Sequence, residues 1–275
     1  MRKITGAYNQ NRRISMMAIG AMLLFTSLMS ACGHSSDAVI IAGSTSVQPY
    51  AEVLAEEYEL LYPGCEIDIQ GGGSAAGITA AESGTADIGM SSRDLNEKEQ
   101  GLWSVEIAKD GLSIIVHPDN PIQNLSIDQV RDIYSAKITN WSELGGLNAK
   151  IHIIAREEGS GTRSAFESLV MGKEKITPKA IVQDSNGAVR QLVSDDINFI
   201  GFISLGLVDR SVKSLTLEGV SPTRENVING SYSLYRPFLF VINGEPARLA
   251  KQFIDFTLSP EGQKILTHEG LVANL

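Results

Sequence analysis

Apolar and polar positions follow two different periods along this chain, and the two periods take turns. Short apolar runs bounded by glycine or turn residues predict strands, and apolar residues spaced three or four apart predict helices. The predicted strands cover residues 38–42, 66–70, 86–90, 150–155, 181–183, 199–203 and 233–242, with a strand pair over 103–116. The predicted helices cover 47–61, 76–82, 126–134, 162–171, 188–194, 246–258 and 260–269. Such alternation is typical of an α/β fold with open, largely parallel sheets.

The order of these elements leaves two domain arrangements open. No Pro/Ser-rich linker separates two sequential domains. Two long strand-like segments, 112–116 and 233–241, can instead serve as paired crossovers between two lobes. In that arrangement the first and last parts of the chain form one lobe and the middle forms the other. Periodicity alone does not decide between the two.

The first thirty residues have the pattern of an export signal. Four basic residues within positions 2–13 precede an uncharged apolar run over 14–28, which is short for a transmembrane span. The run ends in small residues before Cys32, as in a bacterial lipoprotein cleavage site, where the cysteine becomes the lipid-bearing first residue. The alternative is an ordinary signal peptide with an incidental cysteine.

Composition and charge then narrow the classes of function. The 275 residues are 43% hydrophobic, which supplies one large or two smaller cores. The chain has 23 Lys and Arg against 32 Asp and Glu. Cleavage of residues 1–31 would remove four basic and no acidic residues, so the mature chain would have 19 basic and 32 acidic residues and a net charge of -13. No basic stripe for nucleic acid is present. Two cysteines make no disulfide framework, and the four histidines lack metal-ligand spacing.

Three turns rich in glycine and hydroxyl groups each follow a predicted strand and open a predicted helix. They are residues 43–46 (GSTS), 71–77 (GGGSAAG) and 156–162 (REEGSGT). Helix N-termini carry free N–H groups and about half a positive charge, which suits an anion. Taken singly, Thr45, Ser74 and Thr162 are better explained as N-caps. Three such turns together indicate a ligand site, because open α/β sheets bind ligands at strand carboxyl ends. Nucleotide loops are absent, so the predicted ligand is a small anion.

Two charged residues sharpen this expectation. Arg156 stands four residues before Ser160 and can offer an anion a bidentate fork. A surface ion pair with Glu157 or Glu158 is the alternative. Asp87 lies in an otherwise apolar strand-like segment. An ionised carboxylate only accepts hydrogen bonds, so Asp87 would take the proton of phosphate and repel sulfate. A structural cap is the alternative for Asp87.

At these residues the chain resembles the phosphate-binding lipoproteins of bacterial high-affinity phosphate ABC transporters, the PstS-like family. The likeness rests on an ordered set of motifs: 42–49 (AGSTSVQP), 71–77, 86–93 (ADIGMSSR), 133–146 (IYSAKITNWSELGG) and 156–162. It implies a two-lobed periplasmic-binding-protein type II fold, with an open mixed sheet flanked by helices in each lobe and two crossover strands. The implied divisions are a signal peptide 1–31, a lipidated tether 32–37, a first lobe from 38–114 and 235–275, and a second lobe 115–234.

The resemblance also implies a function and a set of binding residues. An extracytoplasmic protein, anchored to the cell membrane by a lipid on Cys32, would capture inorganic phosphate between its lobes and deliver it to transmembrane permease subunits. It would act as a monomer without catalytic residues, metal or cofactor. The implied phosphate-binding residues are Thr45, Ser46, Ser74, Asp87, Arg156, Ser160, Gly161 and Thr162. Ser91, Ser92 and Arg93 lie close by in sequence without an assigned contact.

Three other functions are less consistent with these residues. A hydrolase with Ser160 or Ser74 as nucleophile lacks the GxSxG motif and an obvious histidine base. A binding protein for sulfate, molybdate or tungstate is disfavoured by Asp87. A surface adhesion or signalling lipoprotein is disfavoured by the presence of Arg156 and all three hydroxyl turns.

Overall fold

The computed structural model describes residues 37–273, so the predicted signal peptide, Cys32 and the tether before Asp37 lie outside it. The longer strands are β1 (Asp37–Gly43), β2 (Cys65–Gly71), β3 (Ile88–Ser91), β4 (Trp103–Val116), β6 (His152–Arg156), β7 (Ile181–Gln183), β8 (Phe199–Ser204) and β11 (Tyr235–Ile242). Two-residue strands are β5 (Asn124–Leu125), β9 (Lys213–Ser214), β10 (Thr216–Leu217) and β12 (Val272–Ala273). The helices are α2 (Gln48–Leu61), α3 (Ser74–Ser83), α4 (Ile127–Tyr134), α5 (Gly161–Phe166), α6 (Asn186–Asp195), α7 (Arg224–Ile228), α8 (Arg248–Leu258) and α9 (Pro260–His268).

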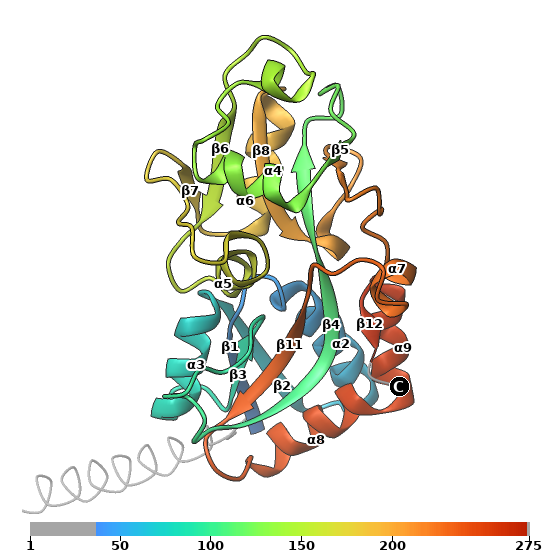
Figure 1. Cartoon of the computed structure of the whole chain (residues 1–275). Helices are drawn as coiled ribbons and strands as arrows, with labels where there is room; N and C mark the ends of the chain where they lie inside the picture. Colours follow the sequence, from blue (N-terminus) through green and yellow to red (C-terminus); the bar gives the residue numbers. More distant parts are fainter. Residues whose placement is uncertain (1–36, 274–275) are drawn as a thin grey trace, which may run out of the picture. The chain divides into compact units, whose positions relative to one another are not determined.

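The α/β class is confirmed, and most predicted elements lie within a few residues of their expected positions (Figure 1). The predicted strand pair over 103–116 is wrong, because β4 is one strand of 14 residues. The predicted helix over 162–171 is divided into α5 and a π-helical turn, Glu167–Met171. Short elements such as α7 and the 3₁₀ turns Trp141–Leu144 and Leu205–Leu207 were not predicted, since they span too few residues to show a period.

The main sheet is mixed and runs in the order β2-β1-β3-β11-β4-β8-β6-β7. β1 pairs in parallel with β2 and β3, and β6 pairs in parallel with β7 and β8. Antiparallel β4 and β11 join these two parallel groups and run side by side in Figure 1. The expected crossover is thus present, but its pairing differs: β11 pairs with the Trp103–Gly111 part of β4, whereas 112–116 pair with β8.

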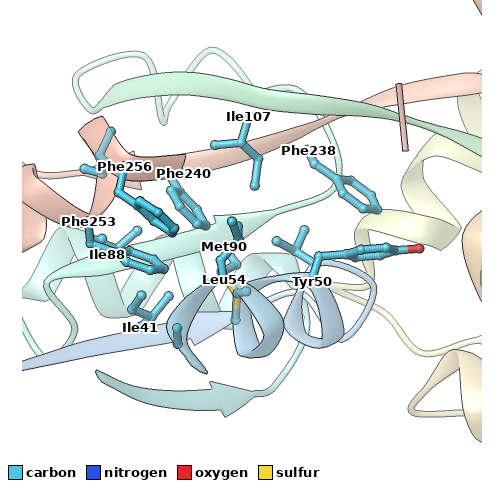
Figure 2. Packing of buried hydrophobic residues seen from close by; sticks show 14 of the residues in the cluster. Ile41, Tyr50, Leu54, Ile88, Met90, Ile107, Phe238, Phe240, Phe253 and Phe256 are labelled. Carbon is cyan, nitrogen blue, oxygen red and sulfur yellow. The ribbon is translucent and has the colours of Figure 1, made fainter. Parts of the chain in front are cut away.

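Two large hydrophobic clusters and two smaller ones form the core of the described residues. The first draws its residues from 39–108 and 238–271, and Figure 2 shows its aromatic rings and aliphatic side chains packed between the sheet and α2 and α8. The second draws its buried residues from 112–234, including Leu112 and Ile114. Smaller clusters under α3 and α6 cover the opposite sheet faces. This packing gives the two-lobed fold its two cores, while the exact lobe boundaries remain a prediction.

The approach of α3 to the sheet depends on two glycines. A Cβ on Gly77 would lie 2.5 Å from the Ala42 carbonyl oxygen, and one on Gly43 would lie 2.3 Å from that of Met90. Gly43 also has φ of 140°, which side chains disfavour. These contacts let the first turn of α3 lie directly against the ends of β1 and β3.

Candidate anion-binding site

The three hydroxyl-rich turns meet at the carboxyl ends of parallel strands. The turns after β1 and β2 belong to the first group of strands, and the turn after β6 belongs to the second. Arg156 Nη2 donates to Thr45 Oγ1 at 3.1 Å, and Ser46 Oγ shares a 2.8 Å hydrogen bond with Thr162 Oγ1. The Ala75 amide donates to the Gly159 carbonyl at 3.0 Å. The structure therefore brings all three turns to one place, as expected from the parallel sheet.

The simpler explanation of the three hydroxyls as N-caps does not hold. The N-cap residues of α2, α3 and α5 are Val47, Gly73 and Ser160. Thr45, Ser74 and Thr162 instead make contacts with other segments of the chain. Ser74 and Thr162 are almost fully buried, and Thr45 is half-buried. Their hydroxyls hydrogen-bond to other segments of the cluster and do not cap the helices that follow them.

Arg156 supplies the positive charge of this cluster and is only 1% exposed. Its Nε and Nη2 donate to the two carboxylate oxygens of Glu157 at 2.9 and 3.0 Å. Nη2 also donates to the Asp184 carbonyl at 2.9 Å, and Nη1 reaches Thr162 Oγ1 at 3.5 Å. The alternative ion pair with Glu157 does form, but the guanidinium is buried among the hydroxyls and not at the surface. Both the ion pair and the ligand role are compatible with this position.

Ser160 and Gly161 lie at the start of α5, where Gly161 contacts the same cluster. Ser160 Oγ accepts the Arg163 amide at 3.3 Å, which leaves its proton free to donate. A Cβ on Gly161 would lie 2.2 Å from Ser74 Oγ and 2.4 Å from Ser92 Oγ. Only a glycine lets the backbone of α5 approach these serines so closely.

A second group of hydroxyls forms around Ser92, which directly follows β3. Ser44 Oγ donates to Ser92 Oγ at 2.9 Å, and the Ser92 amide donates to Ser74 Oγ at 3.0 Å. All three serines are at most 2% exposed. Ser91 Oγ instead donates to the Arg93 carbonyl, and Arg93 forms an ion pair with Glu99. Of the three residues left unassigned in sequence, only Ser92 joins the cluster.

Asp87 does not join the cluster, contrary to its predicted role as a phosphate ligand. Asp87 is exposed, and its Oδ2 accepts the Ile40 amide at 2.8 Å. The sequence pattern placed Asp87 inside a strand over 86–90, whereas β3 begins at Ile88 and ends at Ser91. Asp87 therefore precedes the amino end of β3, and the serine cluster lies at the carboxyl end. The structural-cap alternative describes Asp87 better.

Three further buried polar residues belong to the site and were missed by sequence reasoning. Asn186, at the start of α6, donates through Nδ2 to Ser46 Oγ at 2.9 Å. Arg236 on β11 donates through Nη1 to Ser92 Oγ at 3.3 Å, and it pairs with Asp110 on β4. The serine-rich motif 86–93 carried a signal for Ser92. No local motif marks Asn186, Arg236 or Asp110, which reach the site from distant parts of the chain.

The cluster is suited to bind a small oxyanion. It combines a buried guanidinium with hydroxyl and amide donors, and charge-assisted hydrogen bonds are the strong ones in such surroundings. Among residues 37–273, no group of His, Cys, Asp and Glu is placed to hold a metal ion. Within the same residues, no helix has the length and apolar character needed to cross a membrane. Fold and site together define a two-lobed solute-binding protein with an anion site.

Comparison with known proteins places the chain within that class. The model of the PBP superfamily domain matches residues 30–261. The phosphate-binding protein PstS of Bacillus subtilis is 30% identical over 284 residues, which cover 96% of this chain and 94% of that protein. The chain therefore belongs to the PBP superfamily and, within it, to the family of the phosphate-binding protein PstS.

Two solved structures agree with this assignment. A Clostridium perfringens protein, described as a substrate-binding protein of a phosphate ABC transporter with bound phosphate, is 45% identical with a TM-score of 0.85. The match covers 86% of this chain and 100% of that one. An ABC-type phosphate transport receptor from Vibrio cholerae is 40% identical with a TM-score of 0.72, covering 86% and 99% of the two chains.

Proposed function

We propose that this chain is an extracytoplasmic solute-binding protein that captures inorganic phosphate and delivers it to the permease subunits of an ABC transporter. The observation that carries the proposal is the position of Arg156, buried among hydroxyls contributed by both groups of strands. The similarity to a Clostridium perfringens protein with bound phosphate supports the choice of ligand.

The proposed phosphate ligands combine the predicted set with one addition and one removal. Ser92 is added and Asp87 is removed. The residues kept from the predicted set are Thr45, Ser46, Ser74, Arg156, Ser160, Gly161 and Thr162. Hydroxyls that now bond one another, such as Ser46 with Thr162 at 2.8 Å, would turn their protons toward the anion. Arg156 would keep Glu157 on one edge of its guanidinium and offer Nη1 to phosphate.

Capture follows from the division of these ligands between two lobes. Phosphate would bind first to the turns of one lobe, and a hinge motion of β4 and β11 would bring the other lobe onto it. The direct contact between Ala75 and Gly159 supports a closed arrangement in which few bulky groups separate the lobes. We further propose lobe boundaries at 38–114, 115–234 and 235–275, lipid attachment at Cys32 and a monomeric protein. Membrane anchoring through Cys32 would keep the protein close to its permease.

The proposal is tested by calorimetric titration of the purified protein after bound phosphate is removed by partial unfolding and dialysis. Phosphate should bind with one-to-one stoichiometry, and sulfate, molybdate and tungstate should give no comparable heat. Binding of one of those anions in place of phosphate would identify a different oxyanion transporter. Turnover of a phosphate ester would instead favour the hydrolase alternative, and silence toward every anion would contradict the proposal.

A further inference from the structure

A buried ion pair crosses the two strands that connect the lobes. Arg236 on β11 and Asp110 on β4 are direct cross-strand partners, and they are 2% and 1% exposed. Arg236 Nε and Nη2 donate to Asp110 Oδ2 at 3.1 and 3.0 Å. Asp110 Oδ1 accepts the Ser204 hydroxyl at the end of β8 at 2.7 Å. The pair therefore contacts the first lobe, the second lobe and both connecting strands.

Stability alone does not explain an ion pair in this position. Burial raises the pKa of Asp110, although the neighbouring Arg236 opposes the rise, and burial lowers the pKa of Arg236. Both directions show that removal from water disfavours the charged forms. Hydrophobic residues of similar volume often stabilise a protein as well as a buried ion pair does. The pair is therefore a candidate for a functional role.

The orientation of the pair points to that role. Asp110 lies on the Nε and Nη2 side of the guanidinium, and Ser92 lies on the Nη1 side at 3.3 Å. The positive end of the pair thus faces the serine cluster. Arg156 is close enough to contribute to the lowered pKa of Arg236, so two guanidinium groups influence the same site.

Arg236 also determines which way the Ser92 hydroxyl points. Ser92 Oγ accepts hydrogen bonds from Ser44 Oγ at 2.9 Å and from Arg236 Nη1 at 3.3 Å. A hydroxyl has two acceptor lone pairs and one proton, so these two bonds leave Ser92 with its proton to donate. Among residues 37–273, the other hydrogen-bond partner of this hydroxyl is Ser74 Oγ at 3.3 Å, a long contact that an anion can replace.

We propose that Arg236 is a positioning residue for phosphate, which holds Ser92 as a hydrogen-bond donor and presents the positive end of the Arg236–Asp110 pair to the anion. This inference rests on the proposed phosphate function of the same site. It assigns a binding role to strands that otherwise serve as the hinge between the lobes. Anion binding and the geometry of the hinge strands are then linked through one side chain.

The test compares two variants by phosphate calorimetry, with thermal unfolding as a check of folding. Asp110→Asn leaves the Arg236 charge uncompensated, so phosphate should bind more tightly than to the wild type. Arg236→Gln with Asp110→Asn removes both charges, so phosphate should bind about tenfold more weakly. The same two changes at the ion pair on α4, Arg131→Gln with Asp128→Asn, are the matched control and should leave the affinity unchanged.

Opposite shifts in the two variants separate a binding role from a structural one. Equal affinities, or a loss of the same size in both, would overturn the inference. If either variant fails to fold, Ser92→Ala decides, because unchanged phosphate affinity in that variant would also overturn it. A wild-type protein that binds no phosphate contradicts the proposed function itself, and that outcome is read from the wild-type titration alone.

Discussion

Arg156 and Arg236 are both buried beside the hydroxyl cluster, and they reach it in different ways. Arg156 ends β6, its carboxylate partner is the adjacent Glu157, and that partner is 28% exposed. Arg236 lies within β11, and its partner Asp110 is 126 residues away and fully enclosed. One site thus contains two buried positive charges, one placed by a local sequence motif and the other by strand pairing. The first can bind an anion directly, whereas the second acts through Ser92.

Loss of Arg156 should lower phosphate affinity more than any other change considered for the two arginines. Arg156→Gln removes a charge that contacts hydroxyls from both lobes, so we expect phosphate affinity to fall by about a hundredfold or more. Calorimetry measures the affinity, and Arg156→Lys should recover part of it because the charge remains without the fork. If Arg156→Gln loses less phosphate affinity than the double variant Arg236→Gln with Asp110→Asn, the roles assigned to the two arginines would be reversed.

Gly161→Ala should push α5 of the second lobe away from the serines of the first lobe without removing a polar group. The new Cβ would meet Ser74 Oγ and Ser92 Oγ below 2.5 Å, so α5 must move away from both serines. Phosphate affinity should fall by roughly tenfold, about the loss of one charged hydrogen bond. Gly187→Ala is the matched control, since a Cβ there meets nothing within 4 Å in the first turn of α6. Equal affinities in the two variants would show that α5 does not close on the anion.

Substitutions at the two ends of β3 should have smaller effects on phosphate affinity, and they distinguish Ser92 from Asp87. Ser92→Ala should weaken phosphate binding several-fold because one donor is lost. Asp87→Asn should leave both phosphate and sulfate titrations unchanged, and it should cost little stability because the Asn side-chain oxygen can still accept the Ile40 amide. A gain of sulfate binding in Asp87→Asn would restore the original prediction that Asp87 discriminates between the two anions.

Ionic strength should have the smallest effect. The predicted mature chain carries -13, which opposes long-range attraction of an anion, so affinity must come from local buried donors. Phosphate affinity should therefore change little between about 0.05 and 0.5 M salt, because buried contacts are weakly screened. A steep fall in calorimetric affinity over this range would indicate exposed cations in place of Arg156 and Arg236.

Most of the fold could be predicted from the sequence, and so could the meeting of the three hydroxyl-rich turns. Strands such as β1 and β2 and helices such as α2 and α8 have clear periods, and parallel strands place their following turns at one edge. Those facts predicted that Thr45, Ser74 and Arg156 meet. They depend on short segments whose residues are neighbours in the chain.

The failures have two causes: one misassigned strand end, and contacts between segments that are distant in the chain. Asp87 stands near the amino end of the strand both in the predicted bounds 86–90 and in β3, so the rule that ligands bind at strand carboxyl ends already disfavoured it. Arg236 faces Asp110 because of antiparallel register between β11 and β4, and register across 126 residues leaves no local pattern. Asn186 reaches Ser46 only after both lobes are folded.

The most direct measurement is a crystal structure of the protein with phosphate. We predict one phosphate in contact with Thr45, Ser46, Ser74, Ser92, Arg156 and the 160–162 turn. Arg236 should keep its hydrogen bond to Ser92, and Asp87 should keep its hydrogen bond from the Ile40 amide. Phosphate bound elsewhere, or in contact with Asp87, would contradict the account.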